Sequence, residues 1–154
     1  MEITLSYAEI LFDLQTKNRE EVRSIQDPRA KYFAEAGSEK MSDIVRCIHE
    51  ASLQVRSLCA RFINYQRVED ASNIIEPKET DVIDFDFSER RALGKGPVLA
   101  QTLHSLIVNH ALSKFYNNVQ QPDLASKRAQ LAADDTKLLN KLLYEKLEPV
   151  YPRQ

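Results

Sequence analysis

The chain has 154 residues, enough for one domain with a sizeable core, and its three glycines and abundant Leu, Ala, Glu, Lys, Gln and Arg favour helix over sheet. Its 21 lysines and arginines are nearly balanced by 23 aspartates and glutamates, which gives a formal net charge of −2. This balance argues against a general nucleic-acid-binding protein, which normally carries a basic excess, and we expect no sequence-specific nucleic-acid partner.

The start of the chain predicts two helices joined by a turn. Ser6 and Glu9 have the spacing of a capping box, in which the serine accepts a hydrogen bond from the first turn and the glutamate reaches back. We expect a first helix from this cap to about residue 25. Asp27 and Pro28 then supply an N-cap and a first-turn proline for a short helix over 28–36.

The clearest helix is predicted over about 39–65, with Ser38 as its cap. Its apolar residues recur at three- and four-residue steps, which is the period of a helix with one buried face. These residues are Met41, Ile44, Val45, Ile48, Val55, Leu58, Cys59, Phe62 and Ile63.

The two cysteines, Cys47 and Cys59, both fall on this helix. A rise of about 1.5 Å per residue separates them by roughly 18 Å, which is too far for a disulfide with each other. We therefore expect two buried free thiols in a reducing compartment. Because the first residues lack the basic and apolar regions of a secretory signal, we expect the cytoplasm of the producing cell as the location.

Helical periodicity stops after residue 65, and 66–97 reads as an inserted segment with two prolines and two glycines. Within it, apolar residues alternate with Asp84 and Asp86, which is typical of a short half-buried strand. Two interpretations stay open: a hairpin that folds onto its own domain, or an arm whose apolar face packs on a partner. The arm interpretation assigns partner contacts to Ile83, Phe85 and Phe87.

A small basic cluster follows the strand and consists of Arg90, Arg91 and Lys95. One interpretation is a solvated loop. The others are contact with a phosphate or with the acidic stretch of a neighbouring copy, which places these residues at an inter-subunit contact. The sequence around Lys95 is not a phosphate-binding P-loop, because position 89 is Glu and position 96 is Gly, where that motif needs a glycine and a Ser or Thr.

Residues 96–113 contain no Asp, Glu, Lys or Arg, and apolar residues surround most of a helix predicted over 98–119. A helix that is apolar on nearly all sides is wrapped by other protein or lies in a membrane. Gln101, His104 and Asn109 interrupt the apolar span, so we expect no membrane partner. The helix is therefore expected at the centre of the domain or shared with another subunit.

The last helix is predicted over 122–147. Its leucines recur every seven residues at Leu124, Leu131 and Leu138. The charged residues Arg128 and Asp135 interrupt the side of the helix that these leucines form. Charged residues in such a place either extend to solvent at the edge of a buried seam or lie in a polar interface between subunits. In the second case Arg128 and Asp135 contact a neighbouring copy.

No residue pattern in the sequence points to catalysis. The pair His49-Glu50 begins like a zinc-protease helix, but position 53 is Leu where the second histidine is needed. His104 and His110 lie about 120° apart round a helix, so they cannot bind one metal ion without outside ligands. We therefore expect no enzyme activity, no metal and no cofactor.

Together these elements predict an all-α fold: a bundle of four to five helices with two long C-terminal helices and a short extended or β excursion around residues 80–90. No internal repeat or low-complexity tract divides the chain. We expect a single helical domain over 1–147, with 66–97 inserted as an arm and 148–154 as an extended tail.

Two stretches resemble the small all-helical head–tail connector proteins of tailed phages, which form rings below the portal. One is SEKMSDIVRCIHEASLQVRSLCARFI, a helix of spaced aliphatic residues that ends near an aromatic. The other is PVLAQTLHSLIVNHALSKFYNN, a helix that starts at a proline and ends in an aromatic pair. Together they cover about a third of the chain.

The resemblance implies a homo-oligomeric ring, with portal or tail proteins as partners and the virion as the final location. On this expectation the chain is a structural virion protein of a phage or prophage that self-assembles as a connector at the head–tail junction. The alternative is a cytoplasmic helical adaptor or regulatory protein that binds a cellular protein partner through the same surfaces.

Overall fold

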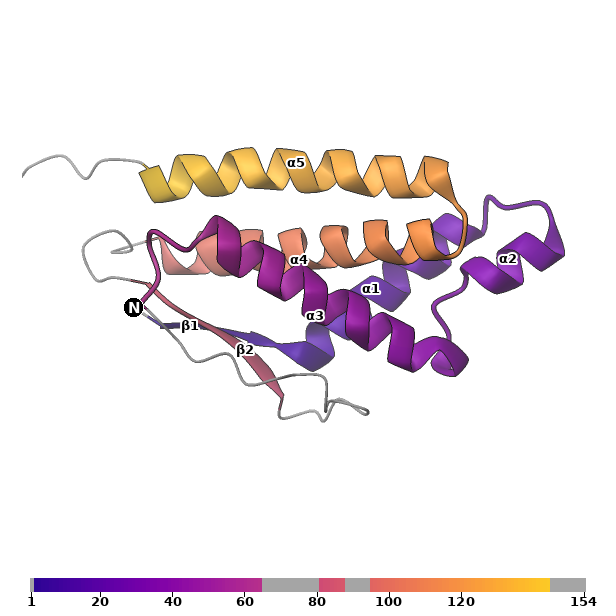
Figure 1. Ribbon diagram of the computed structural model, residues 1–154, viewed down its shortest axis with the longest axis horizontal. Coiled ribbons are helices and arrows are strands. Elements are labelled where there is room, and N and C mark those ends of the chain that lie inside the picture. Colours follow the sequence, from indigo (N-terminus) through magenta and orange to yellow (C-terminus); the bar gives the residue numbers. More distant parts are fainter. Residues whose placement is uncertain (1, 65–80, 88–94, 145–154) are drawn as a thin grey trace, which may run out of the picture.

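The structure is a computed structural model and describes residues 2–64, 81–87 and 95–144. Within these ranges the chain forms a bundle of helices with one small sheet (Figure 1). The elements are β1 (Glu2–Ser6), α1 (Tyr7–Val22), α2 (Pro28–Ala34), the 3-10 helix η1 (Ser38–Lys40), α3 (Met41–Leu58), β2 (Val82–Asp86), α4 (Gly96–Asn118) and α5 (Pro122–Tyr144). The predicted mostly helical bundle, with two long C-terminal helices and a short extended segment, is confirmed.

The predicted starts of the first two helices are confirmed. The hydroxyl of Ser6 accepts a hydrogen bond of 3.3 Å from the backbone N–H of Glu9. A carboxylate oxygen of Asp27 accepts one of 3.0 Å from the backbone N–H of Arg29. Each cap satisfies an N–H group that has no partner inside its helix. Both helices end two to three residues earlier than the sequence predicts.

The third helix departs from its prediction at both ends. Ser38 does not cap it; this serine begins η1, and no side-chain hydrogen bond caps α3. The helix ends at Leu58 instead of near residue 65, because the chain tightens into turns after Cys59 and then joins β2. The backbone N–H of Asn64 donates 2.8 Å to the carbonyl of Asp86. Both cysteines are buried and free, as predicted.

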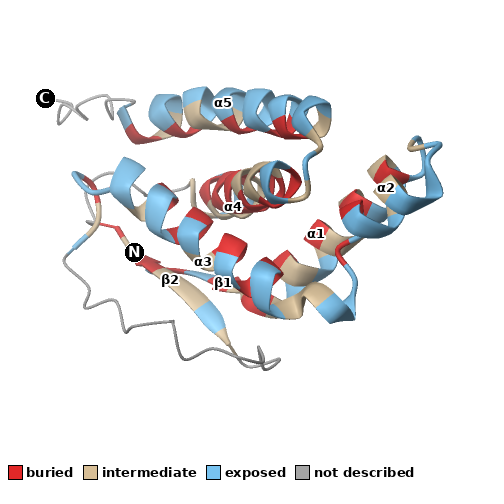
Figure 2. Ribbon diagram, turned by 45° about the vertical axis from the view of Figure 1, so that its right-hand side comes forward, coloured by how far each residue is buried: buried red, intermediate tan, exposed pale blue. Residues whose placement is uncertain are grey.

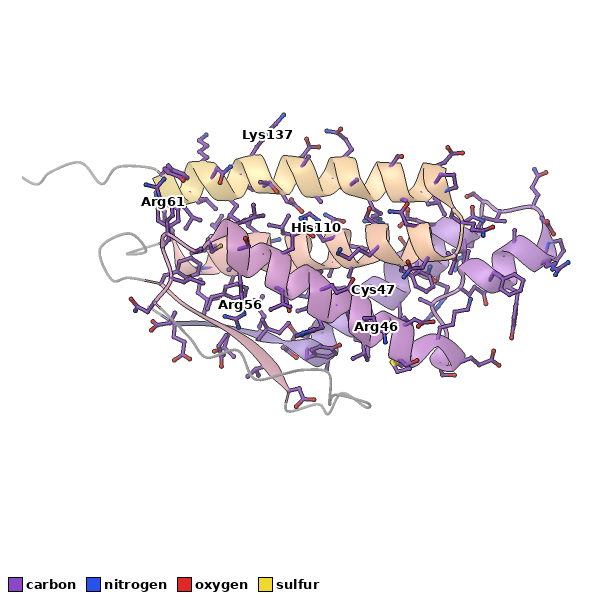
Figure 3. The ribbon with its side chains drawn as sticks, in the orientation of Figure 1. Arg46, Cys47, Arg56, Arg61, His110 and Lys137 are labelled. Atoms are coloured by element: carbon purple, nitrogen blue, oxygen red, sulfur yellow. The ribbon has the colours of Figure 1, made fainter. Side chains whose placement is uncertain are left out.

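The sheet consists of β1 and β2, which pair antiparallel with Ile3 opposite Phe85. The sequence predicts the second strand but not the first, which leads directly into α1. Phe85 is fully buried, Phe87 is almost so, and Ile83 packs against the same core. The guanidinium of Arg56 on α3 lies 4.9 Å from the centre of the Phe85 ring (Figure 3).

This burial corrects the arm interpretation for the strand. Ile83, Phe85 and Phe87 contribute to the core of their own domain, so the aromatic pair has no surface left for a partner. β2 packs on its own domain because β1 pairs with it and supplies backbone hydrogen bonds that an unpaired strand would lack. The remainder of the predicted insertion, apart from 81–87 and 95–97, lies outside the described residues, as does the predicted tail.

Helix α4 is the centre of the bundle, as its uncharged sequence predicts. It packs against α1, α3, α5 and β1, and Figure 2 shows buried residues on most of its surface. Leu103, Leu106 and Leu112 are completely buried along it. Among the described residues, no helix combines the length and the hydropathy that crossing a membrane requires.

Candidate functional site

Helix α5 carries the first candidate surface, because its leucines do not all face α4. The residues that it buries are Ala125, Arg128, Ala132, Leu139 and Leu143. Small alanines at two of these places let α5 approach α4 closely. Leu131 and Leu138, by contrast, are 37% and 43% exposed. We call Leu131 and Leu138, together with the half-buried Leu142, the leucine ridge.

The seven-residue repeat of leucines therefore marks the edge of the α4–α5 seam and not its centre. Leu124, the first of the repeat, is half-buried and packs against the core. The buried positions lie about 100° further round the helix, one residue after each repeated leucine. The ridge is consequently an apolar surface that the described part of the chain leaves partly open to solvent.

The two charged residues of this seam turn inward, which corrects the prediction that they contact a neighbouring copy. Arg128 is buried and pairs with the carboxylate of Glu21 on α1, which its Nε reaches at 2.6 Å. Asp135 accepts hydrogen bonds from Ser105 (2.7 Å) and Asn109 (2.8 Å) on α4. Both side chains are held within the domain by partners on other helices.

The Glu21–Arg128 pair belongs to a larger buried polar network. Arg128 donates 2.9 Å to the side-chain oxygen of Asn109, and Tyr116 donates 3.4 Å to Glu21. The side chain of Asn18 donates to the Tyr116 hydroxyl and to the carbonyl of Ala34 at the end of α2, and it accepts from the backbone N–H of Ala36. Burial, followed by the charge of Glu21, raises the pKa of Tyr116. The network fixes α1, α4 and α5 to one another and positions the ridge.

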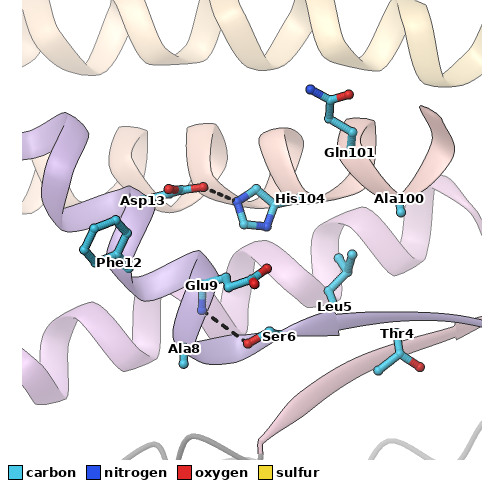
Figure 4. Close-up of a pocket in the computed structure, with 10 residues that line it drawn as sticks. All are labelled: Thr4, Leu5, Ser6, Ala8, Glu9, Phe12, Asp13, Ala100, Gln101 and His104. Carbon is cyan, nitrogen blue, oxygen red and sulfur yellow. Dashed lines mark hydrogen bonds and ion pairs between the residues drawn. The ribbon is translucent and has the colours of Figure 1, made fainter. Parts of the chain in front are cut away.

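The second candidate surface is a groove of about 530 Å³ between β1, α1 and α4 (Figure 4). Its lining residues are Thr4, Leu5, Ser6, Ala8, Glu9, Phe12, Asp13, Ala100, Gln101 and His104. We call this hollow the α1 groove. It contains two carboxylates, those of Glu9 and Asp13, and neither lysine nor arginine is among these lining residues.

Two features of the α1 groove stand out. Phe12 is 68% exposed although it is a large aromatic residue. The Nε2 of His104 lies 2.5 Å from a carboxylate oxygen of Asp13, so this histidine has a partner within the chain. The sequence contains one signal for the groove: Phe12 lies away from the apolar stripe of the first helix.

The histidines and cysteines do not form a metal site in the described part of the chain, where no group of three or more ligating side chains occurs. Burial lowers the pKa of His110, and nearby Lys114 lowers it further. Of the predicted basic cluster, Lys95 lies half-buried at the start of α4. Arg90 and Arg91 lie outside the described residues.

Comparison with known proteins identifies no relative of this chain. No protein-family model matches the chain, and no curated protein or solved structure is significantly similar to it. Any functional assignment therefore rests on the residues of the chain itself and on the two surfaces described above.

Proposed function

We propose that this chain is a non-enzymatic structural subunit of a phage or prophage virion, and that copies of it assemble as a connector ring at the head–tail junction. The observation that carries the proposal is the leucine ridge on α5. Portal or tail proteins are the partners of the finished ring. The subunit is made in the cytoplasm of the producing cell and ends in the virion.

The ridge supports self-assembly because it exposes large apolar side chains in a regular row. Single exposed leucines are common on proteins, but a row of them along one helix edge is typical of a surface that another protein covers. Burying a leucine completely contributes about 1.5–3 kcal/mol relative to leaving it in water. About two-fifths of that gain is still available at Leu131 and Leu138, which are 37% and 43% exposed, and a neighbouring subunit supplies the cover.

The connector role draws its support from the resemblance of the two quoted stretches. In the structure they correspond largely to α3 and α4, which pack against each other at the centre of the bundle. The resembling segments therefore form one packed unit instead of two separate surface pieces. This arrangement leaves α5 and the groove on the outside, where contacts between subunits are made.

The test is the mass of the purified chain in solution, measured by light scattering after size-exclusion chromatography. We expect a ring-sized species many times the 17.7 kDa chain mass, and closed rings in negative-stain images. We expect the ridge variant, Leu131→Glu with Leu138→Glu, to lack this ring-sized species. Leu53→Glu on α3 is the matched control, because Leu53 is 40% exposed but lies outside the ridge.

A wild-type chain that stays monomeric at tens of micromolar contradicts self-assembly and favours the alternative of a helical adaptor. Loss of the large species in the control variant as strongly as in the ridge variant contradicts the role of α5. Mass spectrometry of virions from the producing strain then tests the location, and absence of the chain from purified particles contradicts the connector role.

A further inference from the structure

We propose that the leucine ridge of one copy docks in the α1 groove of the next copy. This inference rests on the proposed self-assembly and specifies the two surfaces that meet. A ring with cyclic symmetry needs such a head-to-tail contact, because every subunit must present two different and complementary surfaces. The described part of the chain contains both surfaces, on different helices.

The shapes of the two surfaces are compatible. The ridge is the convex edge of a long helix, and Leu131 and Leu138 lie about 10 Å apart along it. The groove is concave, and the exposed ring of Phe12 borders it (Figure 4). An amphipathic helix commonly docks in such a hollow through apolar residues one and two turns apart.

The charges are complementary as well. Glu9 and Asp13 place two carboxylates in the groove; because that of Asp13 is already paired with His104, Glu9 is the acidic group that a docked lysine would meet. The exposed Lys141 follows Leu138 by about one turn and so lies beside it on the helix surface, whereas the exposed Lys137 lies about 100° further round the helix. Figure 3 shows Lys137 pointing away from the body of the molecule. Asp134 lies about one turn from both leucines and keeps its negative charge, although its carboxylate accepts a hydrogen bond of 3.2 Å from Gln130, so the basic partner that the ridge offers is Lys141.

A ridge-to-ridge contact explains fewer of these observations. It covers the leucines, but it closes as a two-fold dimer and cannot extend into a ring. It also leaves Phe12 in water and gives Lys141 no contact with the groove carboxylates. The docking of ridge in groove covers the phenylalanine and gives Lys141 an acidic partner in Glu9.

Complementation between two variants tests the inference. The ridge variant is Leu131→Glu with Leu138→Glu, and the groove variant is Phe12→Gln, a neutral change of a largely exposed side chain that creates no new charge pair with the altered ridge. Each variant alone is expected to be a monomer. Mixed in equal amounts, they are expected to form a dimer of about twice the chain mass and nothing larger, because one intact ridge meets one intact groove. Light scattering measures both states.

If wild type assembles but the mixture stays monomeric, this inference is overturned and the proposed self-assembly stands. A wild-type chain that is itself monomeric overturns the proposed function. Should the ridge variant fail to fold by circular dichroism, Lys141→Glu replaces it, since this lysine is exposed. We expect this change to weaken assembly about tenfold or more and Glu9→Lys to restore it. Assembly unchanged by the lysine substitution would contradict the docking.

Discussion

Arg128 and Glu21 form a salt bridge between the last helix and the first, with both side chains less than 10% exposed. Removing two charges from water is costly, and the attraction between them offsets this only while both are present. Asn109 and Tyr116 satisfy further polar atoms of the pair. Loss of one partner therefore harms the fold more than loss of both.

We expect Arg128→Ala to lower the free energy of unfolding by about 3–5 kcal/mol, because it leaves the buried Glu21 carboxylate with only the more distant and largely exposed Lys127 as a counter-charge. Urea denaturation followed by circular dichroism measures the change. Lys127→Ala is the control, since Lys127 is 62% exposed and only 3.9 Å from the same carboxylate, and we expect it to cost about 0.5 kcal/mol or less. The double change Glu21→Met with Arg128→Met should cost less than Arg128→Ala. Equal losses in Lys127→Ala and Arg128→Ala would contradict the buried pair.

The cysteine thiols give a second test at this scale. Burial, with smaller effects of Glu50 and Asp43, raises the pKa of Cys47 to about 11, and burial raises the pKa of Cys59 to about 12. An unfolded thiol has a pKa of about 8.5. Because the folded protein keeps these thiols protonated to higher pH than the unfolded chain, they contribute to the free energy of unfolding. This contribution is fully present below about pH 8.5 and is lost as the pH rises through the pKa values of Cys47 and Cys59 in the folded protein.

Between about pH 9 and 11 we therefore expect wild type to lose stability faster than the variant Cys47→Ala with Cys59→Ala. Denaturation midpoints at several pH values measure this difference, and the absolute stability of the variant serves as its own baseline at pH 7. Parallel pH profiles of the two proteins would show that the thiols ionise as readily when folded as when unfolded.

Strand β2 shows what the sequence reveals about an element and what it hides. Its alternation of aspartates with Ile83, Phe85 and Phe87 predicts a half-buried strand, and this is confirmed. Its partner β1 has the same length but runs directly into α1 with no residue between them, so its alternation merges with the start of the helix. Without that partner, a packed strand and a protruding arm are equally compatible with the pattern.

We expect Phe85→Ala to destabilise the monomer by about 3–5 kcal/mol, because Phe85 is fully buried in the core. Val82→Ala on the same strand is the matched control, since Val82 is 50% exposed and should cost little. Thermal melting of both variants at equal concentration measures the difference. Unchanged melting of Phe85→Ala with lost assembly would restore the arm interpretation.

For the whole molecule, the sequence predicts the central position of α4 and the helical bundle, because both follow from local composition and period. The partners of Arg128 and Asp135 could not be predicted in this way. Glu21 precedes Arg128 by 107 residues, and only the folded chain brings them together. The groove around Phe12 likewise depends on the approach of β1, α1 and α4, which no local pattern describes.

The leucine ridge is a surface whose exposure also could not be predicted from the local sequence pattern. A seven-residue repeat predicts a buried seam, and the sequence cannot tell that the alanines beside the leucines make the closer approach to α4. Placing the alanines inside shifts Leu131 and Leu138 toward solvent. The surface that carries the proposed function thus arises because α5 buries the positions about 100° round the helix from its repeated leucines.

The most direct test of assembly through α5 is a cryo-electron microscopy reconstruction of the purified wild-type chain. We expect a closed ring in which Leu131 and Leu138 of every subunit are covered by the next copy. A monomeric chain, or an assembly in which the leucine ridge faces solvent, would contradict it.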